Sequence, residues 1–86
     1  MHKLEKILKA LANRRRLAIL KYLKENKEAT VTEIAGKINL SFKATSKHLG
    51  VLSAIDIIER DQRSSRMFYS LSAKQEPSIK YIISIL

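Results

Sequence analysis

One stretch in the middle of the chain decides the fold: Ile34-Ala35-Gly36-Lys37-Ile38-Asn39-Leu40-Ser41-Phe42-Lys43-Ala44-Thr45-Ser46-Lys47-His48-Leu49. Its pattern predicts a short helix with an apolar face, a tight turn that ends at the helix-capping Ser41, and a second helix over 42–54. The outward face of this second helix carries Lys43, Ser46 and Lys47. Two helices at a steep angle, the second with small polar and basic side chains, can fill a DNA major groove. The stretch therefore predicts a helix-turn-helix that binds double-stranded DNA.

Composition and charge narrow the class of protein. The chain has 86 residues, of which 45% are hydrophobic, with only two glycines and one proline. These values predict a single, mostly helical globular domain over 1–86. The formal net charge is +9, which favours a polyanionic partner, either nucleic acid or an anionic membrane surface.

Several protein classes are disfavoured by what the sequence lacks. It has no run of 18 apolar residues, and its first residues lack the apolar core of a signal peptide, so we expect a cytoplasmic protein without a membrane span. There is no cysteine, and only His2 and His48 offer imidazole nitrogens. Zinc sites use three or four protein ligands. We therefore expect no metal and no cofactor.

Catalysis is not expected either. Ser46 and His48 are two residues apart on a predicted helix, so their side chains point roughly 200° apart and cannot form a nucleophile–base pair. No glycine loop for phosphate and no pair of carboxylates at a useful spacing is present. His48 is better interpreted as a partly buried structural histidine that hydrogen-bonds backbone. The sequence does not predict an enzyme.

Three elements precede the central stretch. A helix over 3–12 is predicted by apolar residues at helical spacing, Leu4, Ile7, Leu8 and Leu11. Asn13 is a good N-cap for a second helix, which fades through residues 25–28. Val31 is flanked by threonines and suits a very short extended piece, and Thr32 is expected to cap the next helix.

The last third of the chain predicts a hairpin and a final helix. Residues 57–61 and 66–71 read as extended, and the polar turn between them is predicted at 62–65. Pro77 suits the first position of a helix over 77–86. Helices followed by a basic hairpin make a winged helix-turn-helix. The predicted fold is mainly α with a small β-hairpin, in the order α-α-β-α-α-β-β-α.

Six short runs of the chain together match a known pattern. They are Leu11–Leu20, Val31–Ala35, Ser46–Leu49, Leu52, Ile58–Arg60 and Phe68–Leu71. With this spacing, residues 4–71 resemble the ArsR-type winged-helix transcriptional repressors. The resemblance implies a homodimeric repressor, with helix 42–54 in the major groove and the wing 60–66 on the adjacent backbone or minor groove. It also implies that the first and last helices form the dimer.

The chain departs from the ArsR-type pattern at several positions. Arg14 stands where the family usually has proline, Asp56 stands where it usually has glycine, and the wing tip contains no glycine. Asp tolerates the left-handed backbone conformation better than most residues, so we expect the fold to be kept. Metal-sensing members carry a cysteine motif near 31–33 or Asp and His ligands on the last helix. This chain has neither.

Eight residues are predicted to bind DNA: Ser41, Phe42, Lys43, Ser46, Lys47, Arg60, Arg63 and Arg66. Lys43 would reach a base edge or a phosphate, while Ser46 and Lys47 would fix the backbone register. The arginines would hold phosphates or enter the minor groove, and Arg63 is the strongest candidate of the three. The alternatives are a solvated helix face and edge-strand charges that discourage aggregation. For Phe42, we favour packing onto the helix pair over contact with a base.

Three consecutive arginines open the second helix at its positive end. A cation there costs about 0.3–1 kcal/mol unless it is paired. By the family pattern we expect Arg16 to be structural and to pair with a carboxylate. Arg14 and Arg15 either hold DNA at longer range or form a solvated cluster.

Dimerisation is predicted from apolar stripes on the two terminal helices. The predicted interface residues are Leu4, Ile7, Leu8, Leu11, Ile79, Ile82, Ile83 and Leu86. Both stripes could instead serve the core of the monomer. However, Tyr81 and Ile85 make the last helix apolar nearly all round, so it needs a second covering surface. We interpret that surface as a symmetric partner chain.

The leading hypothesis is a sequence-specific double-stranded DNA-binding regulator, a homodimer that acts as a repressor. The alternatives are a winged-helix protein-interaction module and an architectural DNA-binding protein without sequence preference. Basic residues on the predicted DNA side favour DNA over a protein partner. The ratio of specific to random binding separates a regulator from an architectural protein. The sequence indicates no membrane partner and identifies no small-molecule effector.

Overall fold

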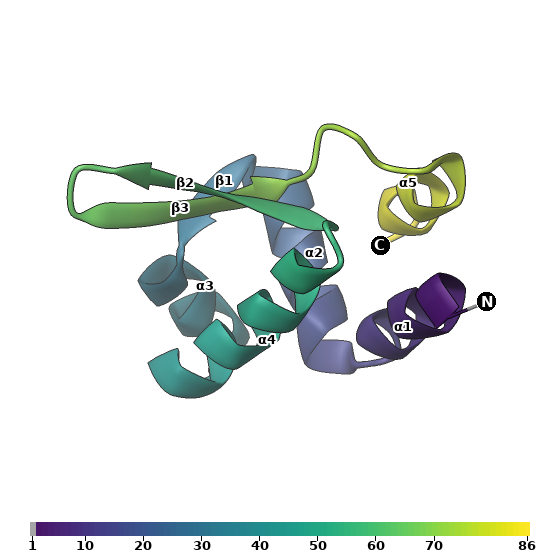
Figure 1. Cartoon of the computed structure of the whole chain (residues 1–86). Coiled ribbons are helices and arrows are strands. Elements are labelled where there is room, and N and C mark those ends of the chain that lie inside the picture. Colours follow the sequence, from purple (N-terminus) through teal and green to yellow (C-terminus); the bar gives the residue numbers. More distant parts are fainter. Residues whose placement is uncertain (1) are drawn as a thin grey trace.

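The computed structural model describes residues 2–86, and within this range it contains five helices and three strands (Figure 1). They are α1 (His2–Leu11), α2 (Arg14–Asn26), β1 (Glu28–Thr30), α3 (Val31–Ile38), α4 (Phe42–Ala54), β2 (Ile58–Arg63), β3 (Arg66–Leu71) and α5 (Pro77–Ser84). The predicted order of elements is confirmed, and the bounds of the 42–54 helix are correct. Asn13 caps α2 as predicted, since its side chain accepts hydrogen bonds from the backbone N–H groups of Arg15 and Arg16.

The hairpin belongs to a three-stranded antiparallel sheet in the order β1-β3-β2. β1 pairs with the end of β3, with Thr30 opposite Phe68 and Glu28 opposite Ser70. The predicted extended piece at Val31 is therefore displaced, because Val31 is the first residue of α3. Its pairing partner β3 was not predicted, because the paired residues, such as Thr30 and Phe68, lie far apart in the chain.

Thr30, and not Thr32, caps α3. The Thr30 hydroxyl accepts a hydrogen bond from the Glu33 N–H at 3.3 Å, and a Glu33 carboxylate oxygen accepts one from the Thr30 N–H at 2.8 Å. This reciprocal pair satisfies two backbone donors at once, which a cap at Thr32 could not do with Glu33 at the adjacent position. The pKa of Glu33 is lowered mainly by the hydrogen bond from the Thr30 N–H to its carboxylate, and then by one from the Thr30 hydroxyl at 3.1 Å.

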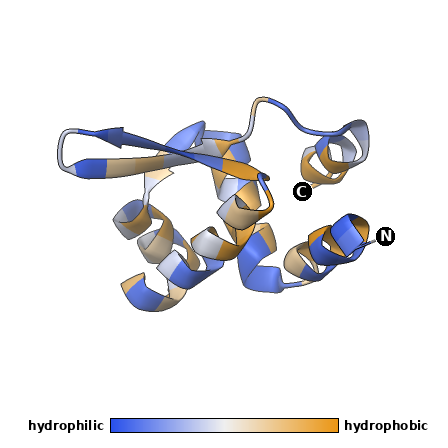
Figure 2. Ribbon diagram, viewed as in Figure 1, coloured by the Kyte–Doolittle hydropathy of each residue, from blue (hydrophilic) through white to orange (hydrophobic). Residues whose placement is uncertain are grey.

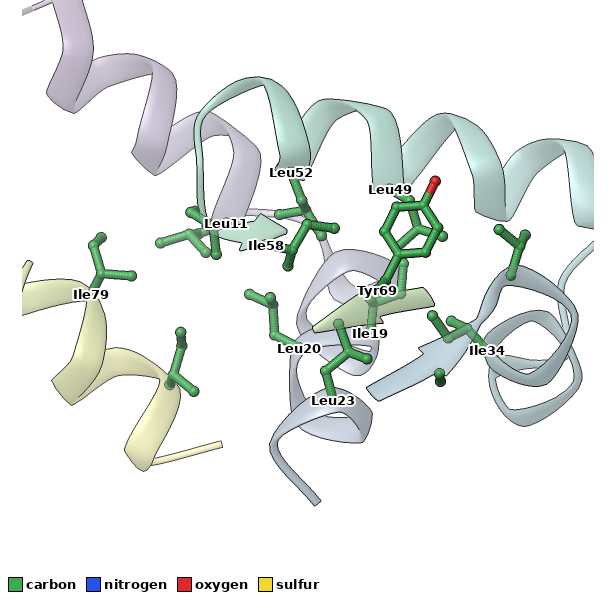
Figure 3. Packing of buried hydrophobic residues seen from close by; sticks show 14 of the residues in the cluster. Leu11, Ile19, Leu20, Leu23, Ile34, Leu49, Leu52, Ile58, Tyr69 and Ile79 are labelled. Carbon is green, nitrogen blue, oxygen red and sulfur yellow. The ribbon is translucent and has the colours of Figure 1, made fainter. Parts of the chain in front are cut away.

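The core lies between α2, α4 and the inner face of the sheet (Figure 3). Its fully or almost fully buried members include Ile19, Leu20 and Leu23 of α2, Ile34 of α3, Leu49 and Leu52 of α4, and Ile58 and Tyr69 of the sheet. Complete burial of an aliphatic side chain contributes about 1.5–3 kcal/mol relative to exposure. The two helices of the helix-turn-helix, α3 and α4, and the sheet thus share one core.

α1 and α5 lie together at the end of the molecule opposite the hairpin tip (Figure 1). Lys3 of α1 forms an ion pair with Glu76, the residue before α5, at 3.4 Å. The two helices also border a small shared pocket, which Ile7 and Ile79 help to line. The wing and the terminal helices therefore form opposite ends of the molecule.

Within residues 2–86, no helix has both the length and the apolar character needed to span a bilayer.

Candidate nucleic-acid interface

The turn between α3 and α4 sets the direction of the predicted recognition helix. Asn39 ends α3 in the left-handed conformation with φ 55°, which Asn adopts at lower cost than most residues. Ser41 is extended, and its hydroxyl accepts a hydrogen bond from the Ala44 N–H at 3.1 Å. This confirms the predicted cap. The chain thus leaves one helix and starts the next within three residues.

α4 has one buried face and one open face. Thr45, Leu49 and Leu52 are completely buried. Lys43 and Lys47 are exposed, and Ser46 is half-buried beside them. Neither lysine takes part in an ion pair within residues 2–86. Both ammonium groups are therefore free to meet an external anion.

Phe42 does not pack onto the helix pair, so that part of the prediction is wrong. Its side chain is 59% exposed. It borders an open groove of about 440 Å³ between the first turn of α3, the first turn of α4 and the hairpin. The other lining residues are Thr30, Val31, Thr32, Ser65, Arg66 and Met67. The groove connects the start of the recognition helix to the wing.

The wing has a tighter turn than expected. β2 continues through Arg63, so the turn is formed by Ser64 and Ser65 alone. In the absence of glycine, Ser64 adopts a left-handed φ of 56°. Asp56, before β2, has φ 60°, as expected for the position where the ArsR-type pattern has glycine. Figure 2 shows that the outer part of the hairpin is mostly hydrophilic.

The three wing arginines do not form one cluster. In the β2–β3 register, Arg60 is opposite the buried Tyr69, and Arg63 is opposite Arg66. Because side chains alternate along a strand, Arg60 and Tyr69 share one face of the hairpin, and Arg63 and Arg66 share the other. Arg63 and Arg66 are therefore neighbours on one face, and Arg66 also borders the groove beside Phe42.

Arg63 is already engaged by acidic neighbours. Its Nη2 contacts the Glu28 carboxylate at 2.7 Å, its Nε lies 3.2 Å from an Asp61 oxygen, and its guanidinium stacks 3.8 Å from the centre of the Phe68 ring. The hydrogen bond to Glu28 is the main cause of a raised Arg63 pKa. Sequence reasoning missed this arrangement because Glu28 is 35 residues away and reaches Arg63 only through the pairing of β1 with β3.

His48 is half-buried, as predicted, but it bonds a side chain and not the backbone. Its Nδ1 accepts a hydrogen bond from Arg16 Nε at 3.2 Å. Burial is the main cause of a lowered His48 pKa, with smaller contributions from Arg16, Arg15 and Lys47. Arg16 is structural as expected, but no carboxylate of the described residues 2–86 pairs with it. Its other contacts are with backbone carbonyls.

The predicted dimer residues divide into two groups. Ile7, Leu11, Ile79 and Ile83 belong to the chain's own core, which is the alternative that the sequence left open for both stripes. Ile82 and Leu86 are half-buried against that core. The side chains left open are Leu4 at 51%, Leu8 at 52%, Tyr81 at 67% and Ile85 at 64% exposure. We call these four the terminal apolar surface.

The described part of the chain, residues 2–86, contains no group of three or more His, Cys, Asp or Glu side chains placed to hold a metal ion. The open polar side chains of the α4–wing region include lysines, arginines and hydroxyl residues, next to the acidic Glu59 and Asp61 of β2. Lysine, arginine and hydroxyl side chains are the donors that contact phosphates and base edges in protein–DNA interfaces.

Comparison with known proteins agrees with this geometry. A family of winged helix-turn-helix DNA-binding domains matches residues 12–59. The transcriptional activator HlyU of Vibrio cholerae is 36% identical over 80 residues, which cover 93% of this chain and 70% of HlyU. The structure of reduced HlyU has a TM-score of 0.83 at 35% identity and covers 99% of this chain and 85% of its own.

Two further solved structures are similar. The transcriptional repressor PagR of Bacillus anthracis has a TM-score of 0.80 at 25% identity, over 98% of this chain and 92% of PagR. The domain of Mb0332 from Mycobacterium bovis has a TM-score of 0.83 at 25% identity, over 98% of this chain and 74% of its own. That domain is described as homodimeric and as part of a possible ArsR-family transcriptional regulator. The present chain belongs to the winged helix-turn-helix DNA-binding family, as a relative of the HlyU-like and ArsR-type regulators of transcription.

Proposed function

We propose that the chain acts as a homodimeric, sequence-specific transcriptional repressor. The observation that carries this proposal is the two-sided character of α4. Its buried stripe is completely covered by the core, while its two exposed lysines have no ion-pair partner among residues 2–86. A rigid helix with a free basic face suits the major groove of DNA.

In this proposal the two ends of α4 and the wing have different roles. Lys43 lies two residues past the Ser41 cap, at the helix end that would enter the groove most deeply, so it reaches base edges. Ser46 and Lys47 hold the backbone. The groove beside Phe42 receives the DNA strand that separates the major groove from the wing, where Arg66 and Thr32 can donate to its phosphates. Arg60 and Arg63 contact that backbone or the next minor groove.

Repression is proposed as the direction of regulation. A domain that covers the DNA of a promoter blocks polymerase by occupancy alone, and it needs no surface for recruiting other proteins. PagR, a similar structure, carries the name of a repressor. HlyU, which is more similar in sequence, carries the name of an activator. A reporter with the bound site placed over the promoter, and then upstream of it, distinguishes the two directions.

The dimer is proposed to form through the terminal apolar surface. Leu4 and Leu8 on α1, Tyr81 on α5 and Ile85 directly after α5 are all exposed. The similar Mb0332 domain is described as homodimeric. A two-fold related copy would cover this surface and place two α4 helices on one side of the assembly.

The dimer proposal is tested with Leu8→Asp combined with Ile85→Asp. Two charges per chain in an apolar seam would cost several kcal/mol, roughly the value of breaking buried contacts. Sedimentation should show a monomer, and circular dichroism should still show a folded chain because both positions are exposed in the monomer. Ser78→Asp, at an exposed position in the first turn of α5, is the matched control and should remain dimeric. A dimer that survives both charges would place the interface elsewhere.

The DNA proposal is tested by capturing genomic fragments on the protein, sequencing them, and measuring affinity for the enriched duplex and a scrambled one at fixed salt. A regulator should prefer the enriched duplex by roughly a thousandfold or more. Equal affinities would indicate an architectural DNA-binding protein. Absence of binding to any duplex would favour the protein-interaction module.

A further inference from the structure

One side chain connects three helices of the molecule. Arg16 begins in the first turn of α2. Its Nη1 donates to the carbonyl oxygens of Ala10, at 3.3 Å, and Lys9, at 3.5 Å, in the last turn of α1. Its Nε donates to Nδ1 of His48, at 3.2 Å, near the middle of α4. The guanidinium thus bridges the end of α1 and the recognition helix.

The local electrostatics explain why the guanidinium sits there. A cation is unfavourable at the start of its own helix but favourable beside the C-terminal carbonyls of another, which carry partial negative charge. Arg16 turns away from the first and toward the second. Its planar fork holds donors in fixed directions, so it can bond α1 and α4 at the same time. A lysine has the charge but not this geometry.

His48 fits the other end of this bridge only as a neutral acceptor. Because Nδ1 accepts from Arg16, the imidazole proton is assigned to Nε2. Burial and the positive charges of Arg16, Arg15 and Lys47 favour the neutral form. His48 also follows Lys47 directly, so a fixed imidazole ring fixes the part of α4 from which the proposed DNA-contacting lysine extends.

We propose that Arg16 and His48 form a positioning pair that fixes α4 relative to α1 and so sets the distance between the two recognition helices of the dimer. The inference rests on the proposed function, because it needs a dimer that reads two half-sites. α1 carries half of the terminal apolar surface, so it belongs to the dimer end of the molecule. Apolar packing alone lets helices slide, whereas hydrogen bonds with fixed directions resist it.

The readout that separates positioning from mere stability is the spacing between half-sites. Adding one base pair at the centre of the operator moves one half-site by about 3.4 Å along the helix axis and about 35° around it. A rigid dimer should lose roughly tenfold or more in affinity for such a duplex. A dimer whose recognition helices can shift should lose much less.

The experiment uses the 86-residue chain, the enriched duplex, and duplexes with one base pair added or removed at the centre. His48→Leu removes the acceptor, and Arg16→Lys keeps the charge but loses the fork. For both variants we expect the affinity ratio between correct and altered spacing to fall by about tenfold or to vanish. His48→Asn places an amide oxygen near the Nδ1 position and should restore the ratio. Lys21→Ala, an exposed charge loss on α2, is the control and should leave it unchanged.

Each result decides the proposal. If His48→Leu and Arg16→Lys keep the wild-type ratio, or if His48→Asn behaves like His48→Leu, the pair does not position α4. Circular dichroism identifies an unfolded variant. If either one unfolds, the decision falls to the other and to His48→Asn. If the wild-type protein itself binds all spacings equally, the proposed two-site dimer fails, which is a different outcome from failure of the pair.

Discussion

The recognition helix and the wing carry similar numbers of cations but differ in how free those cations are. Lys43 and Lys47 on α4 have no acidic partner within residues 2–86, whereas Arg63 on the wing is bound to Glu28 and Asp61 and stacked on Phe68. A phosphate can approach α4 directly, but it must compete with two carboxylates for Arg63. Counting basic residues therefore overstates the contribution of the wing to DNA binding.

The largest effect in this comparison is expected from Lys43→Ala. Loss of a base contact should cost about 1–3 kcal/mol on the enriched duplex and should flatten the preference at particular base pairs. Affinity measured on a panel of single-base variants tests this. Lys74→Ala, an exposed lysine outside the proposed interface, is the control. A uniform loss on all sequences would mean that Lys43 holds the backbone and does not read bases.

A smaller effect of opposite sign is expected from Glu28→Gln. The change removes the main partner of Arg63 and one negative charge near the DNA, so affinity should rise on specific and random duplexes alike. The slope of log affinity against log salt should steepen by up to roughly 0.9 per chain as Arg63 gains a phosphate. If the affinity falls, the ion pair between Glu28 and Arg63 supports DNA binding by the wing and does not restrain it.

Arg63→Ala should weaken binding to all duplexes and lower the salt slope by less than the value of about 0.9 per chain expected for a full phosphate contact. The physical reason is that Arg63 must leave the carboxylates of Glu28 and Asp61 in order to bind a phosphate. Combining it with Glu28→Gln measures how strongly the two residues are coupled. Equal slope changes for Arg63→Ala in the presence and absence of Glu28 would show that the ion pair does not restrain the arginine.

The smallest expected effect is a pH dependence of stability. It arises from His48 on α4 and not from the wing. The His48 pKa is lowered in the folded chain from its ordinary value of 6.5, so folding favours the neutral imidazole. The stability linked to His48 is fully present above pH 6.5 and is lost as the pH falls through the lowered folded pKa. Melting temperatures at pH 8 to 5 should therefore fall more steeply for the wild type than for His48→Asn. Identical pH profiles would exclude this linkage.

Local patterns in the sequence predicted the elements well. The α4 bounds, the Ser41 and Asn13 caps and the start of α5 at Pro77 all depend on residues within one helical turn of each other. The features that were missed depend on partners far apart in the chain. The Arg16–His48 and Glu28–Arg63 contacts span 32 and 35 residues, and the pairing of β1 with β3 is of the same kind.

The terminal helices show a different limit of sequence reasoning. Helical spacing correctly indicated that Ile7, Leu11, Ile79 and Ile83 are covered. It could not indicate by which surface, because a core and an interface select the same residue types. The distinction required the structure, in which these four are buried by their own chain while Leu8 and Tyr81 remain open.

Thr30 is both the last residue of β1 and the cap of α3, so no linker separates the sheet from the helix-turn-helix. Because of this direct connection, we expect the distance between the tip of the wing and α4 to be fixed. A duplex must fit that distance or bend and change its groove width to do so, at an energy that depends on its sequence. Base pairs that no side chain touches would then influence affinity, and exchanging flexible steps for a stiff A-tract beneath the wing would measure that influence.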